Sequence, residues 1–106
     1  MNFPTKMYID GALTNGSATR DVINPATDTL VATVAVAGAD DAERALQSAK
    51  ATFPIWAAMP IAERQAWMRK LRDAVVEAED WLRTCVHHEM GKPWAQTEED
   101  WGRLVA

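Results

Sequence analysis

The sequence has a single cysteine, no long apolar run and no excess of basic charge. Cys85 alone among 106 residues excludes an internal disulfide and fits a reducing compartment. No apolar stretch approaches the ~18 residues of a membrane span, and the first residues lack the apolar segment of a secretory signal. The net charge of −4 offers no basic face to nucleic acid. We therefore expect a cytoplasmic protein whose partners include neither membrane nor nucleic acid.

Tyrosine and phenylalanine are scarce, whereas five tryptophans are many for a chain of 106 residues. Rings of this size need deep burial, and three helices offer little depth. At helical spacing in an acidic chain, tryptophans belong more often to a core or an interface than to a ligand pocket or a surface that stacks nucleobases. We expect some of these rings to pack against protein outside this sequence.

The first third of the chain, about residues 6–36, is predicted to form antiparallel strands. Asp10-Gly11 accepts the positive φ angles of a tight hairpin turn and lies between two short extended runs. Asn24-Pro25 ends a further strand, because proline removes a hydrogen-bond donor from the ladder. These signals predict at least one hairpin before the first helix.

The last predicted strand, Leu30–Val36, is apolar on both faces. Leu30 and Val34 share one face, and Val31 and Ala35 share the other. A strand that is apolar on both faces usually packs against other protein on both sides.

Three helices are predicted after the strands, over about residues 39–58, 60–90 and 93–106. Gly38 is a weak N-cap for the first helix, and Pro54 should kink or end the regular helix near Phe53. The second helix has two adjacent apolar lines, which suggests contact with more than one neighbour.

The sequence stops while the third helical pattern is still running. Trp101-Gly102-Arg103-Leu104 keeps the helical rhythm, and no capping glycine or proline follows it. We interpret the chain as the front piece of a larger protein. The apolar residues of this helix and of Leu30–Val36 then lack the protein that would pack against them. Such exposed apolar surface predicts self-association.

Cys85, His88 and Glu89 follow one another at i, i+3 and i+4, which places three potential metal ligands on one helix flank. Zinc usually needs a fourth ligand, and Cys85 continues an apolar seam, where a free cysteine acts as a small hydrophobe. Cys85 with His87 or His88 is also a poor nucleophile–base pair, because catalytic pairs usually come from different elements. Packing is therefore the favoured interpretation, and a helical metal-binding protein is the alternative.

Two further patterns favour structure over chemistry. Gly11 and Gly16 have the spacing of a phosphate-binding loop, but the Lys-Ser/Thr that would contact phosphate is missing. Asn15-Gly16-Ser17 matches a glycosylation acceptor by chance, since no secretory signal precedes it.

Glu98-Glu99-Asp100 is an acidic run within the last helix. Consecutive side chains diverge around a helix, whereas an acid–base pair needs carboxylates that converge. A solvated face is the favoured interpretation.

Six short motifs follow one another along the chain: Tyr8-Ile9-Asp10-Gly11, Val22-Ile23-Asn24-Pro25-Ala26-Thr27, Leu30–Val36, Ala49-Lys50-Ala51-Thr52-Phe53-Pro54-Ile55-Trp56, Ile61-Ala62-Glu63-Arg64 and Glu89-Met90-Gly91-Lys92-Pro93. Each motif is weak alone, but the ordered set with matching gaps is specific. This ordered set resembles the N-terminal region of the NAD(P)-dependent aldehyde dehydrogenase superfamily.

The resemblance implies an α+β fragment from the outer part of a Rossmann-like α/β cofactor-binding domain, with residues 1–106 as its N-terminal segment. Enzymes of the family oxidise aldehydes to carboxylic acids through a cysteine thiolate, with NAD or NADP as cofactor, and form oligomers. Their nucleophile, general base and cofactor-contacting residues all follow this region, and Cys85 does not occupy the nucleophile position. The resemblance therefore implies no catalytic, cofactor-binding or metal residue within these 106 residues, and a fragment that is inactive alone.

The resemblance assigns a structural role to two turns. Asn24 and Pro25 turn the chain after a strand, and Gly91, Lys92 and Pro93 form a sharp corner between helices. Some family members bind an alkali cation near these corners through backbone oxygens and an acid, a position that Glu89 occupies here. The alternative from a different class is an independent helical protein-interaction module without catalytic activity.

Overall fold

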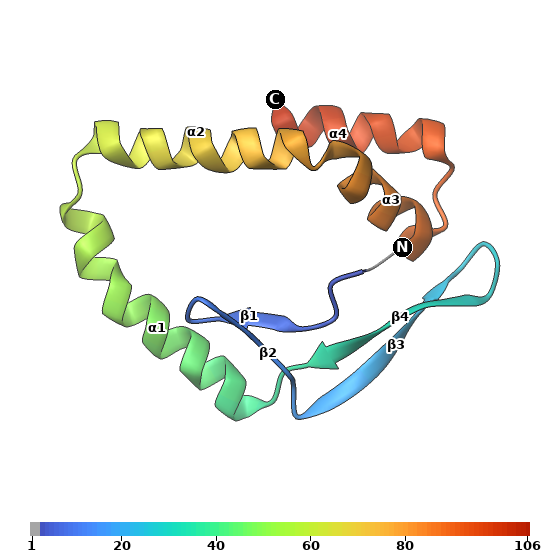
Figure 1. The fold of residues 1–106 in the computed structure, drawn as a ribbon, viewed down its shortest axis with the longest axis horizontal. Helices are drawn as coiled ribbons and strands as arrows, with labels where there is room; N and C mark the ends of the chain where they lie inside the picture. Colours follow the sequence, from blue (N-terminus) through green and yellow to red (C-terminus); the bar gives the residue numbers. More distant parts are fainter. Residues whose placement is uncertain (1–2) are drawn as a thin grey trace. The chain divides into compact units, whose positions relative to one another are not determined.

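The computed structural model describes residues 3–106, and within them strands come first and helices follow (Figure 1). This is the predicted α+β arrangement. The elements in chain order are β1 (Met7–Ile9), β2 (Ala12–Thr14), β3 (Ala18–Asn24), β4 (Thr29–Val36), α1 (Ala39–Ala58), α2 (Ile61–Glu77), α3 (Glu79–Met90), the 3-10 turn η1 (Trp94–Gln96) and α4 (Thr97–Val105).

The chain divides into two compact units. The first unit runs up to Val22 and resumes with Ala32–Met59, and the second combines Ile23–Val31 with Pro60–Ala106. The first unit therefore contains the β1–β2 hairpin and α1. The second contains the turn between β3 and β4 and all later helices.

The β1–β2 hairpin of the first unit is antiparallel, with Met7 opposite Thr14 and Ile9 opposite Ala12. Asp10 has φ 52° and Gly11 has φ 77°. Positive φ at both central residues is the geometry of a two-residue turn that matches the twist of its strands. The predicted hairpin turn at Asp10-Gly11 is confirmed.

β3 and β4 form the second two-stranded sheet. β3 ends at Asn24, as predicted from the proline that follows, and the turn closes where the Asp28 N–H donates to the Asn24 carbonyl oxygen at 2.8 Å. Across the sheet, the Thr33 hydroxyl donates to Asp21 Oδ1 at 2.6 Å. β4 covers the whole of the predicted strand and adds Thr29.

α1 spans the predicted residues 39–58 and has Gly38 as its N-cap. The Gly38 N–H donates to Asp41 Oδ2 at 2.9 Å, so an acid of the first turn satisfies the main chain at the helix start. The helix continues through Pro54 to Ala58 and does not end near Phe53. Because Pro54 lies close to the helix end, its missing N–H and its ring affect only the last turns.

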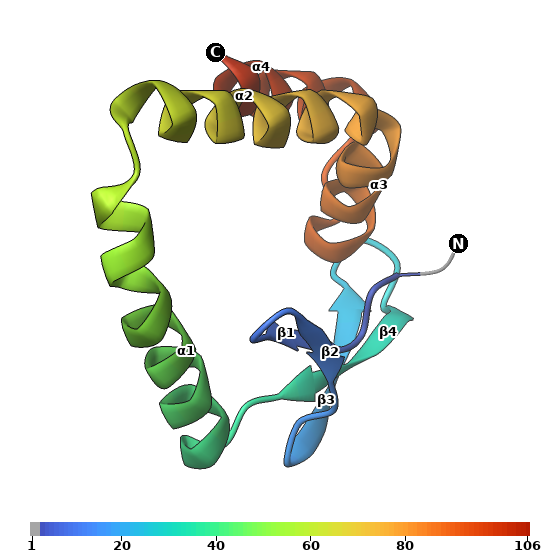
Figure 2. The same cartoon turned by 60° about the vertical axis from the view of Figure 1, so that its left-hand side comes forward.

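The predicted single helix over 60–90 is wrong. The structure divides it at Ala78 (φ −91°, ψ 12°) into α2 and α3, and α3 turns away steeply from α2 (Figure 2). The Ala78 N–H lies within reach of the carbonyl oxygens of Ala74, Val75 and Val76, so the last turn of α2 tightens before the chain changes direction. Glu79 and Asp80 then supply the acids that favour a new helix start.

The third predicted helix, 93–106, begins later than expected. A 3-10 turn occupies Trp94–Gln96, and α4 follows over Thr97–Val105. The short turn follows Pro93, whose carbonyl oxygen accepts the Gln96 N–H at 2.9 Å. Both views show α4 running beside α2 (Figures 1 and 2).

Among residues 3–106 no apolar side chain is buried. The buried residues in this range are polar: Asn24, at 6% exposed, and Thr97, at 1%. Large apolar residues of α1 and α2 stay exposed, among them Phe53 at 67% and Ile61 at 66%. In the same range no helix is long and apolar enough to cross a membrane.

Candidate functional site at the corner of α3 and α4

The two turns singled out in the sequence meet within the second unit. Gly91 ends α3 in the left-handed conformation, with φ 63° and ψ 19°. A Cβ atom on Gly91 would lie 2.9 Å from the Ala26 nitrogen and 3.0 Å from Pro25 Cγ. The close approach of these two turns therefore requires a residue without a side chain at position 91, for steric and conformational reasons together.

Asn24 shapes its own turn from a buried position. Its Oδ1 accepts the Ala26 N–H at 2.9 Å, while its carbonyl oxygen accepts the N–H groups of Thr27 and Asp28. A buried amide must find such partners, because leaving it unpaired costs about 1–3 kcal/mol. Asn24 thus fixes the surface on which Gly91 rests.

Lys92 joins the corner to the helices on both sides. Its Nζ lies 2.6 Å from Asp100 Oδ2 in α4, and its carbonyl oxygen lies 2.5 Å from His87 Nδ1 in α3. Pro93 follows and opens η1. Both the charge and the main chain of Lys92 therefore hold the direction change between α3 and α4.

Arg83 carries a second network that the sequence analysis missed. Its Nε donates to Thr97 Oγ1 at 2.9 Å, its Nη1 donates to Glu79 Oε1 at 3.0 Å, and its guanidinium group lies 4.6 Å from the centre of the Trp94 ring. The Thr97 hydroxyl donates onward to the Trp94 carbonyl oxygen at 2.7 Å. The i, i+4 spacing of Glu79 and Arg83 was the only local signal.

Cys85, His88 and Glu89 do not come together as a site. Burial raises the pKa of the Cys85 thiol and the Glu89 carboxylate raises it further, against a smaller lowering by a backbone hydrogen bond. A raised pKa leaves less thiolate, the form that attacks carbonyls and binds metals. In residues 3–106, no three His, Cys, Asp or Glu side chains are grouped to hold a metal ion, and Glu89 is exposed.

Gly11 lies in the turn between β1 and β2, whereas Gly16 lies in the loop between β2 and β3. Gly11 completes the β1–β2 hairpin, and Gly16 lies against the backbone of Val36. β3 follows at Ala18, so the glycines do not precede a helix as a phosphate-binding loop requires.

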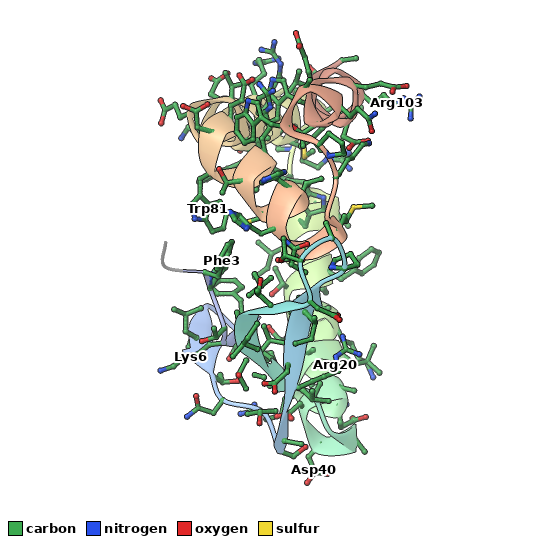
Figure 3. All side chains as sticks on the ribbon, turned by 90° about the vertical axis from the view of Figure 1, so that its right-hand side faces the viewer. Phe3, Lys6, Arg20, Asp40, Trp81 and Arg103 are labelled. Atoms are coloured by element: carbon green, nitrogen blue, oxygen red, sulfur yellow. The ribbon has the colours of Figure 1, made fainter. Side chains whose placement is uncertain are left out.

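The acidic run diverges as predicted. Glu99 pairs with Arg103 on the exposed side of α4, whereas Asp100 reaches back to Lys92. Figure 3 shows Arg103 extending away from the α4 ribbon. The corner is therefore a set of paired charges and buried hydrogen bonds that fixes the directions of helices.

The sequence model of the Aldehyde dehydrogenase family matches residues 13–106. The lactaldehyde dehydrogenase of Escherichia coli (strain K12) is 35% identical over 88 residues, which cover 81% of this chain and 18% of that protein. The chain belongs to the aldehyde dehydrogenase family.

Solved structures of relatives agree with the fold. The succinate-semialdehyde dehydrogenase of Burkholderia pseudomallei matches with a TM-score of 0.84 at 32% identity. The matched region covers 90% of this chain and 20% of that protein. PnpE, solved in complex with nicotinamide adenine dinucleotide, has a TM-score of 0.84 at 31% identity with the same coverage. The chain spans about a fifth of the length of these relatives.

Proposed function

We propose that these residues form the N-terminal scaffold of an NAD(P)-dependent oxidoreductase that converts an aldehyde to a carboxylic acid. The supporting observation is the family membership, combined with relatives that are named as aldehyde dehydrogenases. In this proposal the corner built by Asn24, Pro25, Gly91, Lys92 and Pro93 keeps the strand turn and the helices in a fixed arrangement. The cofactor is NAD, as in the PnpE complex, or NADP.

The catalytic step belongs to residues beyond these 106 in this proposal. Cys85 is the single cysteine of the sequence, and its raised pKa and place on a helix flank do not suit a nucleophile. Its neighbours His87 and His88 lie on the same helix, whereas a base usually reaches a nucleophile from another element. The chain alone is therefore proposed to be inactive and to bind no cofactor tightly.

The partners in this proposal are the remainder of the parent chain and further copies of it, in the cytoplasm. Exposed apolar residues support the need for cover: Trp67 is 54% exposed and Leu104 is 61% exposed. A shallow hollow of about 210 Å³ between α2 and α4 is lined mainly by apolar side chains, among them Met68, Leu71 and Leu104. Surfaces of this kind usually contact other protein.

The test compares two proteins made from the same gene. One is the product of the complete reading frame and the other is residues 1–106 alone. Aldehyde-dependent formation of reduced cofactor is measured with NAD and with NADP. We expect turnover only with the complete product; turnover by residues 1–106, or none by a complete product that retains the family's later residues, contradicts the proposal.

The independent interaction module is the competing function, because a separate protein would cover the exposed apolar faces of α1 and α2 as well as the parent chain would. A reading frame that stops after Ala106, together with a stable complex between this chain and a separate protein, would support the module. A continuing frame supports the scaffold.

A further inference from the structure

The loop between β2 and β3 contains the dipeptide Asn15-Gly16. Asn15 is exposed. No hydrogen bond within residues 3–106 holds its side chain, and the Gly16 N–H takes no part in the main-chain bonds outside helices and strands in that range. Within residues 3–106, therefore, no hydrogen bond holds the Asn15 amide and the Gly16 nitrogen apart.

The fold requires glycine at position 16. A Cβ atom there would lie 2.2 Å from the Val36 oxygen and 2.7 Å from the Val36 nitrogen, both of them main-chain atoms that cannot move aside cheaply. Only a residue without a side chain permits this approach. The same lack of a side chain leaves the Gly16 nitrogen unshielded toward Asn15.

We propose that Asn15 is a site of spontaneous deamidation. The Gly16 main-chain nitrogen loses its proton to solvent base and forms a bond to Asn15 Cγ. The Cγ–Nδ2 bond breaks, and the amide group leaves as ammonia after taking up a proton, so that a five-membered succinimide remains. Water then opens the ring at either carbonyl and gives aspartate or isoaspartate, with no oxidant or reductant involved.

The neighbouring Asp10-Gly11 offers a comparison within the same unit. Asp10 could form the same ring with loss of water, but its Oδ1 accepts the Ser48 hydroxyl at 2.8 Å and its turn is closed by the pairing of β1 with β2. In the described part of the chain, no hydrogen bond restrains the Asn15 side chain in this way. The difference predicts modification at Asn15 before Asp10.

The product adds a carboxylate to an acidic place. The charged side chains that line the same surface hollow as Asn15 are Asp40 and Asp41, at the start of α1. Figure 3 shows Asp40 extending away from the α1 ribbon. Isoaspartate also inserts one carbon into the main chain beside the contact of Gly16 with Val36, so the contact has to loosen.

The experiment uses the protein made from its complete reading frame, incubated in mildly alkaline buffer and followed by peptide mass spectrometry and enzymatic isoaspartate labelling. We expect conversion at Asn15, with isoaspartate and released ammonia. Asn24 is the internal control, because Pro25 has no N–H with which to attack. Asn15→Gln should remove the signal, since the longer side chain forms the larger ring slowly.

Two results would overturn the inference. One is an intact Asn15 amide in the folded protein under conditions in which the urea-unfolded protein deamidates, because the fold would then protect the site. The other is isoaspartate at Asp10 before any change at Asn15. The inference does not rest on the proposed enzymatic function, and either result leaves that function unaffected.

Discussion

Different kinds of contact stabilise the interior of each of the two units. In the first unit the main chain supplies several of the contacts: the β1–β2 ladder, the Ala35 N–H donating to the Thr5 carbonyl oxygen at 2.7 Å, and the approach of Gly16 to Val36. In the second unit a network of side chains around Arg83 and Lys92 fixes the corner. Substitutions should therefore act through backbone geometry in one unit and through side-chain partners in the other.

Gly91 should show the largest effect, because it combines both kinds of constraint. Gly91→Ala places a Cβ at 2.9 Å from the Ala26 nitrogen on a residue with φ 63°. The left-handed conformation costs an alanine about 1–2 kcal/mol and overpacking adds about 1–3 kcal/mol. We expect the free energy of unfolding of the intact protein to fall by about 3 kcal/mol in urea titration.

Gly11→Ala is the matched control for this variant. Gly11 has φ 77° but no atom within 4 Å of an added Cβ, so only the conformational cost of about 1–2 kcal/mol remains. Equal losses in the two variants would show that Pro25 and Ala26 do not press on position 91.

Thr97→Val tests the side-chain network of the second unit. The change keeps the shape but leaves the Arg83 Nε without its buried partner, whereas the Trp94 carbonyl oxygen still accepts the main-chain N–H of residue 97. We expect a loss of about 1–3 kcal/mol in the free energy of unfolding, the cost of an unpaired buried polar group.

Thr52→Val is its counterpart in the first unit. The Thr52 hydroxyl also donates to a helical carbonyl, that of Ser48 at 3.0 Å, but from an exposed position. Its replacement should change stability by less than about 0.5 kcal/mol. A loss as large as that of Thr97→Val would remove the distinction between the buried and the exposed hydroxyl.

The ion pairs of α4 allow a finer comparison. Lys92 is 23% exposed in its pair with Asp100, whereas Arg103 is 74% exposed in its pair with Glu99. Lys92→Gln should cost up to about 1 kcal/mol and Arg103→Gln close to nothing, because exposed pairs contribute little. Unfolding of both variants at low and high salt measures the difference, and an equal or larger loss for Arg103→Gln would contradict it.

Cys85 should produce the smallest effect, visible as a pH dependence. Because burial and Glu89 raise the thiol pKa above its ordinary value of 9.0, the folded state holds the proton more tightly than the unfolded state. The contribution of the Cys85 thiol to the free energy of unfolding is then fully present below pH 9.0 and is lost as pH rises through the pKa of the folded state. Urea titrations in a series of alkaline buffers should show the free energy of unfolding falling with pH. Cys85→Ala should remove the part of this fall that is due to the thiol.

Glu89→Gln separates the two causes of that shift. Removing the carboxylate leaves burial as the remaining cause, so the thiol pKa falls partway toward its ordinary value. Alkylation of Cys85 at a fixed alkaline pH should become faster, and an unchanged rate would mean that Glu89 does not act on the thiol.

Sequence reasoning succeeded where the signal is local and belongs to the main chain. Positive φ at Gly11, the strand stop before Pro25 and the helix end at Gly91 each depend on what one residue type permits. The division at Ala78 could not be found in this way, because alanine favours helix and no glycine or proline marks the break. After the break, Arg83 in α3 contacts Thr97 and Trp94, which are distant in the sequence.

The hydrogen bonds of Arg83 to another helix could not be predicted from local sequence signals either. Arg83 and Thr97 are fourteen positions apart, and no periodic pattern pairs a charged residue of one helix with a hydroxyl at the start of another. The meeting of Asn24-Pro25 with Gly91 was in reach only through the resemblance, since their contact joins distant parts of the sequence.

The lack of a buried apolar side chain among residues 3–106 has a calorimetric consequence. Newly hydrated apolar surface is the main source of the heat-capacity increase that accompanies unfolding, and the same surface sets the steepness of a denaturant transition. These residues on their own should therefore melt over a broad range of temperature, with a shallow heat-absorption peak and a small heat-capacity step.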